Sequence, residues 1–101
     1  MSYQRALLAV GAVLLFTLPA MAVDRVVWHH HRGHFENTTG NHWVEKSPDG
    51  TFYFREVRRA ANYIELYDRS RDCTVRLTPS ACLVRFGGEG FRKFYRGHWE
   101  R

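Results

Sequence analysis

The sequence has little cysteine and proline, and it lacks the motifs on which several enzyme classes depend. Its 101 residues include two Cys and three Pro. No Cys-x-x-Cys occurs, which argues against a thiol–disulfide redox centre. No Gly-x-Ser-x-Gly elbow occurs, so hydrolysis by a serine nucleophile has no support. The length suits one domain and excludes a multidomain enzyme with a large cleft.

Long apolar runs are also lacking. The longest apolar run, at 6–18 (ALLAVGAVLLFTL), has thirteen residues, carries no charge and is broken by Pro19. A helix of that length spans about 20 Å, short of a hydrocarbon core of about 30 Å. Arg5 precedes the run, and Pro19 and then Ala20-Met21-Ala22 follow it. This pattern predicts a signal peptide over residues 1–22 and a secreted or periplasmic protein with no membrane span after cleavage.

The remainder, from residue 23, is small for one hydrophobic core, so a covalent link would stabilise it. Cys73 and Cys82 flank Thr78-Pro79-Ser80, which predicts a turn. Two strands meeting there would bring the cysteines nearly opposite each other, and an exported protein meets oxidising conditions. We therefore expect a hairpin disulfide between Cys73 and Cys82.

Short alternating runs separated by turn residues predict an all-β domain over residues 41–101. Ser47-Pro48-Asp49-Gly50 is a strong hairpin signal, because Pro presets φ and Gly accepts positive φ. About six short strands are expected, in an antiparallel meander that could curl into a small closed barrel and so lose its exposed edges. The expected strands are 41–46, 51–58, 62–67, 73–77, 81–86 and 91–95.

Alternation also predicts which side chains form the core. The predicted core comprises the cysteines, Ile64, Leu66, Val75, Leu77, Val84 and Phe86, joined by Trp43, Phe52, Phe54, Trp99 and one of Phe91 and Phe94. A weak internal repeat is also present: Arg-Gly-His-Phe-Glu at 32–36 returns as Arg-Gly-His-Trp-Glu at 96–100. It is either one unit of a longer repeat or a coincidence in a chain rich in these residues.

Residues 23–40 are interpreted as a His-rich N-terminal arm. Neutral imidazoles bind Zn²⁺, Ni²⁺ and Cu²⁺. In an extended segment His29 and His31 point to the same side, and a third ligand could come from His34 after the bend at Gly33, or from distant His42 or His98. The candidate metal ligands are His29, His31 and His34, although Arg32 between them disfavours a cation. The alternative is an exposed polar arm, and no other cofactor is indicated.

Basic residues exceed acidic ones, at 15 against 10, and all but Lys46 and Lys93 are arginine. Arginine binds carboxylates, phosphates and sulfates through its planar fork, and Tyr adds contact area. A binding surface is therefore expected for an envelope protein, a glycan or an anionic polymer; intracellular nucleic acid is an unsuitable partner for an exported protein. The residues predicted for this surface are Tyr63, Glu65, Tyr67, Arg69, Arg71 and Arg76. The alternative is an ordinary solvated face of ion pairs.

The motifs Trp43-x-Glu45, Phe52-x-Phe54-x-Glu56, Tyr-Ile-Glu-Leu-Tyr-Asp at 63–68 and Val-Arg-Leu at 75–77 stand in a spread pattern. This pattern resembles a family of small exported bacterial all-β modules without a characterised activity. The resemblance implies a fold and a location and adds nothing on mechanism.

We expect an exported noncatalytic binding or structural module of the cell envelope or secreted space, and not an enzyme. The first alternative is a divalent-metal-binding protein. The second is a small secreted nuclease, for which Glu56, Arg58, Arg69 and His98 supply the residue types; general acid–base chemistry would require them to converge on one phosphate.

Overall fold

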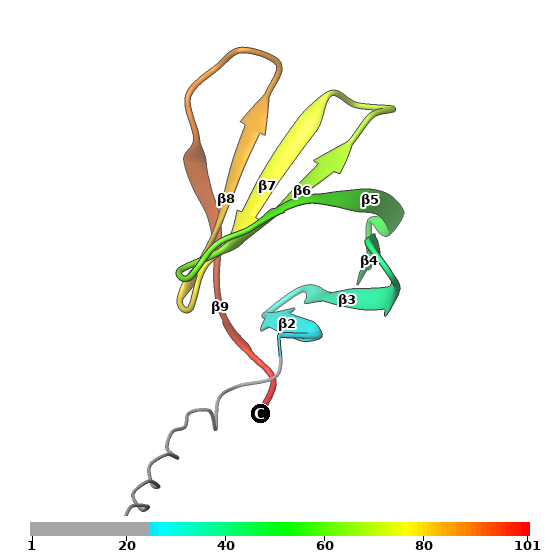
Figure 1. The fold of residues 1–101 in the computed structure, drawn as a ribbon, viewed down its shortest axis with the longest axis vertical. Coiled ribbons are helices and arrows are strands. Elements are labelled where there is room, and N and C mark those ends of the chain that lie inside the picture. The colour runs from blue at the N-terminus through cyan, green and yellow to red at the C-terminus, as the bar shows by residue number, and fades with distance from the viewer. Residues whose placement is uncertain (1–24) are drawn as a thin grey trace, which may run out of the picture.

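The computed structural model describes residues 25–101, which form a closed antiparallel β-barrel (Figure 1). Each strand pairs with the next along the chain, and β2 pairs with β9 to close the barrel. In this range no helix is long and apolar enough to cross a membrane. The predicted signal peptide lies outside the described residues. The strands are β2 (Val27–His30), β3 (Gly33–Thr39), β4 (His42–Ser47), β5 (Gly50–Arg59), β6 (Ile64–Asp68), β7 (Cys73–Leu77), β8 (Ala81–Phe86) and β9 (Arg92–Trp99).

The prediction of an all-β antiparallel meander is confirmed, but the count of about six strands is wrong. The two additional strands, β2 and β3, lie in the segment interpreted as a polar arm. Histidines obscured their alternation: Trp28, His30 and Phe35 are buried while their neighbours are not. The β domain therefore does not begin at residue 41, because residues 27–39 supply two walls of the same barrel.

The core is richer in large aromatic rings than alternation predicted. Trp28 and Phe35, both in the supposed arm, are almost fully buried. Phe86 and Phe94 are exposed, because they lie near the end of the barrel that the core does not fill. The buried core cluster is Trp28, Phe35, Trp43, Phe54, Ile64, Leu66, Cys73, Val75, Leu77, Cys82, Val84 and Trp99.

The two copies of the internal repeat lie on either side of β2, at the same height. His30 pairs with both Gly33 and Gly97, His29 with both His34 and His98, and Trp28 with both Phe35 and Trp99. The similarity therefore corresponds to a shared structural position: two strands of similar sequence flank the strand that closes the barrel.

The predicted disulfide is absent, and both cysteines are free and buried. The turn is centred between Pro79 and Ser80, so Cys82 faces Leu77 and Cys73 faces Phe86. The cysteines are thus offset by four residues along neighbouring strands, about 13 Å, whereas a bridge needs Cα atoms within about 7 Å. The predicted pairing centred the turn two residues too early.

Gly97 provides the first prediction, because its position leaves no room for a side chain. A Cβ there would overlap the carbonyl oxygen of His29 and the indole ring of Trp28. We expect Gly97→Ala to lower the free energy of unfolding by about 2–3 kcal/mol, as overpacking of a core does. Urea unfolding followed by Trp fluorescence measures the change. Gly88→Ala is the matched control, since a Cβ at that position would have no atom within 4 Å; equal effects of the two substitutions would contradict this account.

The free cysteines provide the second prediction. In protein purified without reductant and then unfolded, a thiol reagent should react with two thiols. In the native protein the reaction should be slow, because both thiols are buried. Reductant should leave the melting temperature unchanged. A mass lower by two hydrogens, or a melting temperature that falls on reduction, would show that the cysteines are linked.

Candidate functional site

The two ends of the barrel interior differ. One end is filled by indole rings: Trp43 packs edge-on against Trp99 at 6.2 Å between ring centres, and the Trp28 Nε1–H donates to the carbonyl of Thr78 at 2.7 Å. The Trp43 Nε1–H donates to Glu56 Oε1 at 3.0 Å. Buried indole N–H groups normally find such partners, so this end is a satisfied, closed core.

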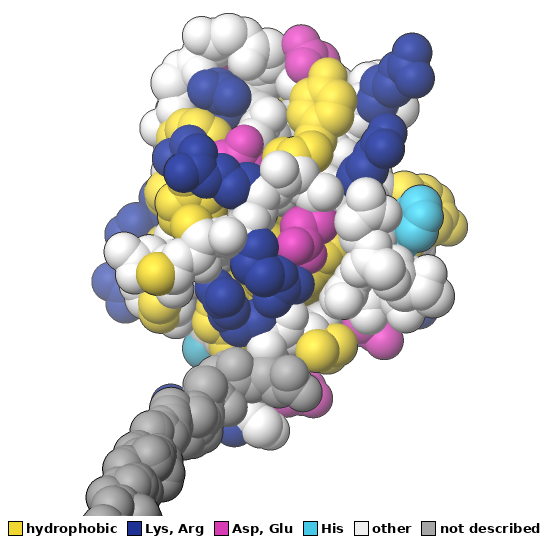
Figure 2. Space-filling model, in the orientation of Figure 1, with side chains coloured by type: hydrophobic (Ala, Val, Ile, Leu, Met, Phe, Trp, Pro, Cys, Tyr) yellow, Lys and Arg dark blue, Asp and Glu magenta, His cyan; other side chains and the backbone are white. Residues whose placement is uncertain are grey.

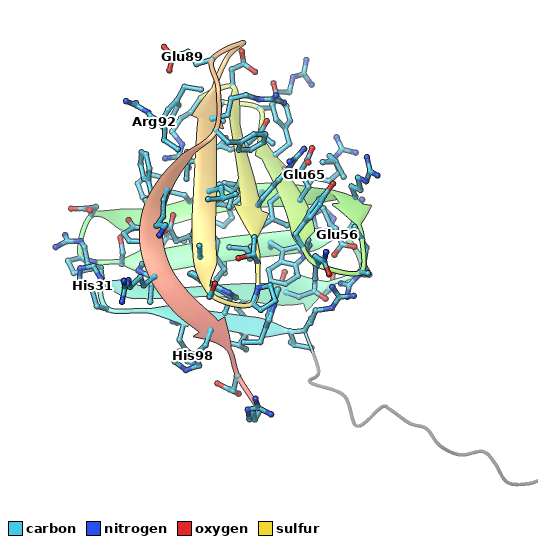
Figure 3. All side chains as sticks on the ribbon, turned by 90° about the vertical axis from the view of Figure 1, so that its left-hand side faces the viewer. His31, Glu56, Glu65, Glu89, Arg92 and His98 are labelled. Atoms are coloured by element: carbon cyan, nitrogen blue, oxygen red, sulfur yellow. The ribbon has the colours of Figure 1, made fainter. Side chains whose placement is uncertain are left out.

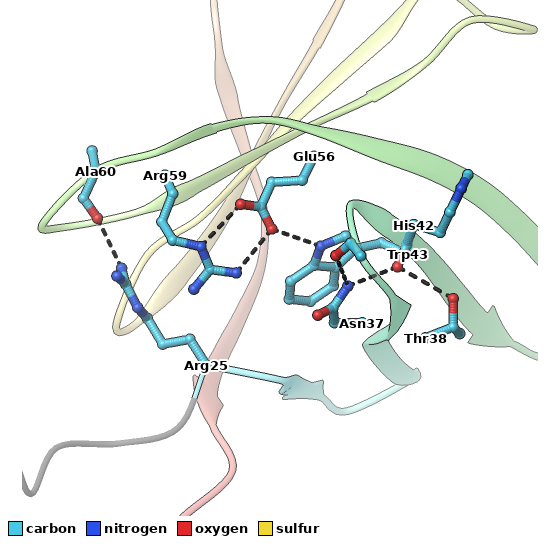
Figure 4. A network of polar contacts seen from close by, with 9 residues as sticks. Arg25, Asn37, Thr38, His42, Trp43, Glu56, Arg59 and Ala60 are labelled. Carbon is cyan, nitrogen blue, oxygen red and sulfur yellow. Dashed lines mark hydrogen bonds and ion pairs between the residues drawn. The ribbon is translucent and has the colours of Figure 1, made fainter.

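Glu56 organises the polar rim of the closed end (Figure 4). Arg59 donates to both of its carboxylate oxygens at 2.9 Å, and nearby Arg25 donates to the carbonyl of Ala60. Burial pushes the pKa of Glu56 upward, but the hydrogen bonds from Arg59 and Trp43 outweigh it and hold that pKa below its ordinary value. Glu56 is therefore an ionised structural group.

The opposite end is hollow. A cavity of about 200 Å³ lies inside the barrel there, next to the β4–β5 and β6–β7 turns. Mouths of small barrels are common places for ligand sites. The aromatic residues that line it are Phe35, Phe52, Phe54, Phe86, Phe94 and Tyr95, and the polar or charged ones are Glu45, Ser47, Asp49 and Arg71.

Glu45 is a buried carboxyl group in the wall of this cavity. It pairs across the sheet with Phe35 on one side and Phe52 on the other. Its Oε2 lies 3.3 Å from Nε2 of His30, whose side chain is fully buried and stacks on Tyr95 at 3.9 Å between ring centres. Nε2 of His30 has no hydrogen-bond partner of good geometry. A carboxyl and an imidazole thus meet in an otherwise aromatic interior.

Burial governs the protonation of this pair. Desolvation raises the pKa of Glu45 to about 7, and the Arg71 charge offsets only part of the effect. Desolvation lowers the pKa of His30 to about 4, helped by neighbouring basic groups. Near neutral pH, His30 is therefore uncharged and Glu45 is close to half ionised. Perturbed groups in a cavity are candidates for function.

The other charges at this end are already paired. Arg71 binds Asp68 through Nε, and Arg32 binds Asp49 at 3.2 Å. Within residues 25–101, no Lys or Arg forms an ion pair with Glu45. Its carboxylate is therefore the one charge in the cavity wall that lacks a cationic partner among the described side chains.

The aromatic wall already accepts a cation. The guanidinium of Arg71 lies 4.1 Å from the ring centre of Phe52 and 5.6 Å from that of Phe54. Such contacts are attractive because the face of the ring is electronegative. These contacts show that the rings of Phe52 and Phe54 can hold a positively charged group.

The predicted metal ligands are only partly brought together. His29 and His34 face each other on β2 and β3, with ring centres 6.1 Å apart. Strand β2 ends at His30, so His31 stands in the turn that follows, and its ring lies near that of Tyr95. His98, which the sequence offered only as an alternative third ligand, has its ring centre 5.7 Å from that of His29. Within residues 25–101, no three candidate ligands already surround a common point.

The predicted Tyr–Arg surface is divided into three parts. Arg76 binds Glu65 at 2.8 Å and stacks on Tyr63, and this cluster continues through Phe91 to Arg85. Figure 2 shows such basic side chains interleaved with hydrophobic ones on one face. Tyr67 instead donates to Asp72, with Arg69 in a nearby depression, and Arg71 turns toward the barrel mouth.

The nuclease residues do not converge. Glu56 is on β5 and His98 on β9, which are four strands apart around the closed barrel and so lie on opposite walls (Figure 3). Glu56 is held by Trp43 and Arg59, and Arg58 lies near Tyr63.

Sequence reasoning missed His30, Glu45 and Tyr95. A signal for two of them was present, since alternation places His30 with Trp28 and Glu45 with Trp43 on the inner face. Their polar character argued for the surface, and only the closed barrel shows that they share an interior.

These features define a class: a small closed antiparallel barrel with one filled end and one hollow, aromatic-lined end. No protein-family model matches the chain, and neither a curated protein nor a solved structure matches it.

The pair of Glu45 and His30 makes a prediction on stability. The raised pKa of Glu45 contributes stability that is present below pH 4.5 and is lost as pH rises through about 7. The lowered pKa of His30 contributes stability that is present above pH 6.5 and is lost as pH falls toward about 4. The two effects oppose each other in nearly the same range, so the wild type should vary little there on their account.

Glu45→Gln should expose the His30 effect. We expect the free energy of unfolding of this variant, relative to wild type, to rise by about 3 kcal/mol between pH 4 and pH 8. Urea unfolding at several pH values measures it. Glu36→Gln, at a partly exposed glutamate on the neighbouring strand, is the control. A Glu45→Gln difference that stays constant with pH would rule out the buried carboxyl as the cause.

Proposed function

We propose that this protein is an exported, noncatalytic binding module that takes a small ligand into the open end of its barrel. The observation on which the proposal rests is a buried carboxyl group, Glu45, in an aromatic cavity and without a cationic partner. Export rests on the predicted signal peptide.

The size and chemistry of the cavity limit the ligand. A closed cavity of about 150 Å³ holds a benzene molecule, so 200 Å³ fits one ring or a short aliphatic body. Phe35, Phe52 and Phe54 favour an apolar or cationic group. The Glu45 carboxylate favours a protonated amine. The proposed ligand class is therefore a small organic amine with an apolar body.

Three compounds of nearly equal shape test this class: benzylamine, benzyl alcohol and benzoate. We expect benzylamine to bind with a Kd of about 0.1–1 mM, near −4 to −5.5 kcal/mol, and the other two more weakly. Amine affinity should increase from pH 5 to pH 8 as Glu45 ionises. NMR chemical-shift titration measures the affinities and locates the affected residues.

Two variants separate the contributions. Glu45→Gln should remove the preference for the amine, and Val84→Phe, which places a ring in the cavity, should block all three compounds; cooperative urea unfolding shows that each variant is folded. No binding tighter than about 10 mM by any compound would refute a small-ligand site here. A preference that survives Glu45→Gln would refute the role of this carboxyl.

A further inference from the structure

Separate from the cavity, a row of histidines crosses the outer face of the barrel where it closes. His34 on β3, His29 on β2 and His98 on β9 occupy one cross-strand row. The neighbouring positions on the same face hold Glu36 and Glu100. Side chains directly opposite on antiparallel strands have Cβ atoms about 5 Å apart, so neighbours in such a row can act on one ligand.

We propose that His29, His98 and Glu100 form a binding site for a late first-row divalent cation. His29 Nε2 and Glu100 Oε1 are hydrogen-bonded at 2.6 Å, so two potential ligand atoms are adjacent and a bound ion would replace the proton between them. The ring centres of His29 and His98 are 5.7 Å apart. Two imidazoles that share one ion through nitrogens at about 2.1 Å have ring centres roughly 5–6 Å apart, so the spacing of these two rings is compatible with one shared ion.

The backbone holds these three residues in register. Glu100 follows the end of β9, and its N–H donates to the carbonyl of Val27 at 2.8 Å, which extends the β2–β9 pairing past Trp99. Gly97 has no side chain, so β9 lies close against β2 at the adjacent pair. The donors therefore come from a rigid part of the barrel.

The other histidines are less suitable. His34 pairs across the sheet with Lys46, a cation, and its Nε2 lies 3.5 Å from Glu36. His31 lies in the turn after β2, outside the cross-strand row, although it lines the same shallow depression as His29 and His98. Arg32, which the sequence placed inside the cluster, is paired with Asp49 and does not oppose a cation at His29. The basic residue that remains is Arg96, which is exposed on β9 and lines the same depression as His29 and His98.

The donor set indicates which ions bind. Two imidazoles and one carboxylate suit Cu²⁺, Ni²⁺ and Zn²⁺, with Cu²⁺ held most tightly. Because the donors do not yet surround one point, side chains must rotate at this exposed site and water must complete the coordination. Binding in the micromolar range is expected, as for a site formed on the surface.

Calorimetric titration of the purified protein, without a histidine tag, with CuCl₂, NiCl₂ and ZnCl₂ tests the proposal. We expect one Cu²⁺ per chain, quenching of Trp fluorescence, and an electron paramagnetic resonance spectrum with nitrogen coupling. His29→Ala and His98→Ala should each weaken Cu²⁺ binding by about tenfold or more, and Glu100→Gln by a smaller factor. These side chains are at the surface, so urea unfolding should show that the variants keep the fold.

His31→Ala and His42→Ala are the matched controls, since both histidines are exposed and outside the row. They should bind Cu²⁺ as the wild type does. The proposal is overturned if the wild type binds no Cu²⁺, if His98→Ala binds it normally, or if His31→Ala is as impaired as His98→Ala. The last result would return the site to the N-terminal histidines that the sequence suggested.

Discussion

The pairing of β2 with β9 is the constraint on which the rest of the structure depends. Without it, the remaining strands would form an open sheet with two exposed edges and an incomplete core. Trp28 is the centre of this closure: it is fully buried, stands opposite Phe35 and Trp99 on the two neighbouring strands, and donates to Thr78. Its ring occupies the space that Gly97 leaves free. One large residue and one absent side chain therefore allow the barrel to close.

Closure of the barrel also bears on the difference between the filled end and the hollow end of its interior. Three buried indole rings, those of Trp28, Trp43 and Trp99, fill one end. At the other end the rings are those of Phe and Tyr, polar side chains such as Glu45 and Ser47 stand among them, and a cavity remains. A closed wall keeps Glu45 and His30 away from water, and desolvation then moves the pKa of each toward its neutral form. An open sheet would leave both groups solvated, and desolvation would then shift neither of them.

Much of the fold could be predicted from local patterns, because turns and period-two alternation depend on residues that are close together in the sequence. Strands β4 to β8 lie close to the predicted ranges for this reason. The turn at 78–80 was also located, but its centre was misplaced, and a shift of two residues was enough to create a false disulfide. The prediction for the histidine-rich segment was wrong for another reason. Its composition suggested a solvated arm, whereas the buried Trp28 and Phe35 place the segment in the core. The site at the barrel mouth needed long-range information, since Glu45 meets His30 and Tyr95 only after closure.

In each copy of the internal repeat, some side chains point into the barrel and the others point outward. Close packing of the strands needs glycine at Gly97, against His29 of β2, and at Gly33, against Lys46 of β4, and the core needs the inward rings of Phe35 and Trp99. The packing does not depend on which residues stand between and beyond these positions, because alternation turns their side chains to the outside. Yet His34 and His98 occupy the first of these outer positions, and Glu36 and Glu100 the second. Many polar residues would satisfy a solvated position on a strand. A histidine two residues before a glutamate on each strand beside His29 gives the surface contacts His29–Glu100 and His34–Glu36, and the atoms of the first of these contacts are donors of the proposed cation site.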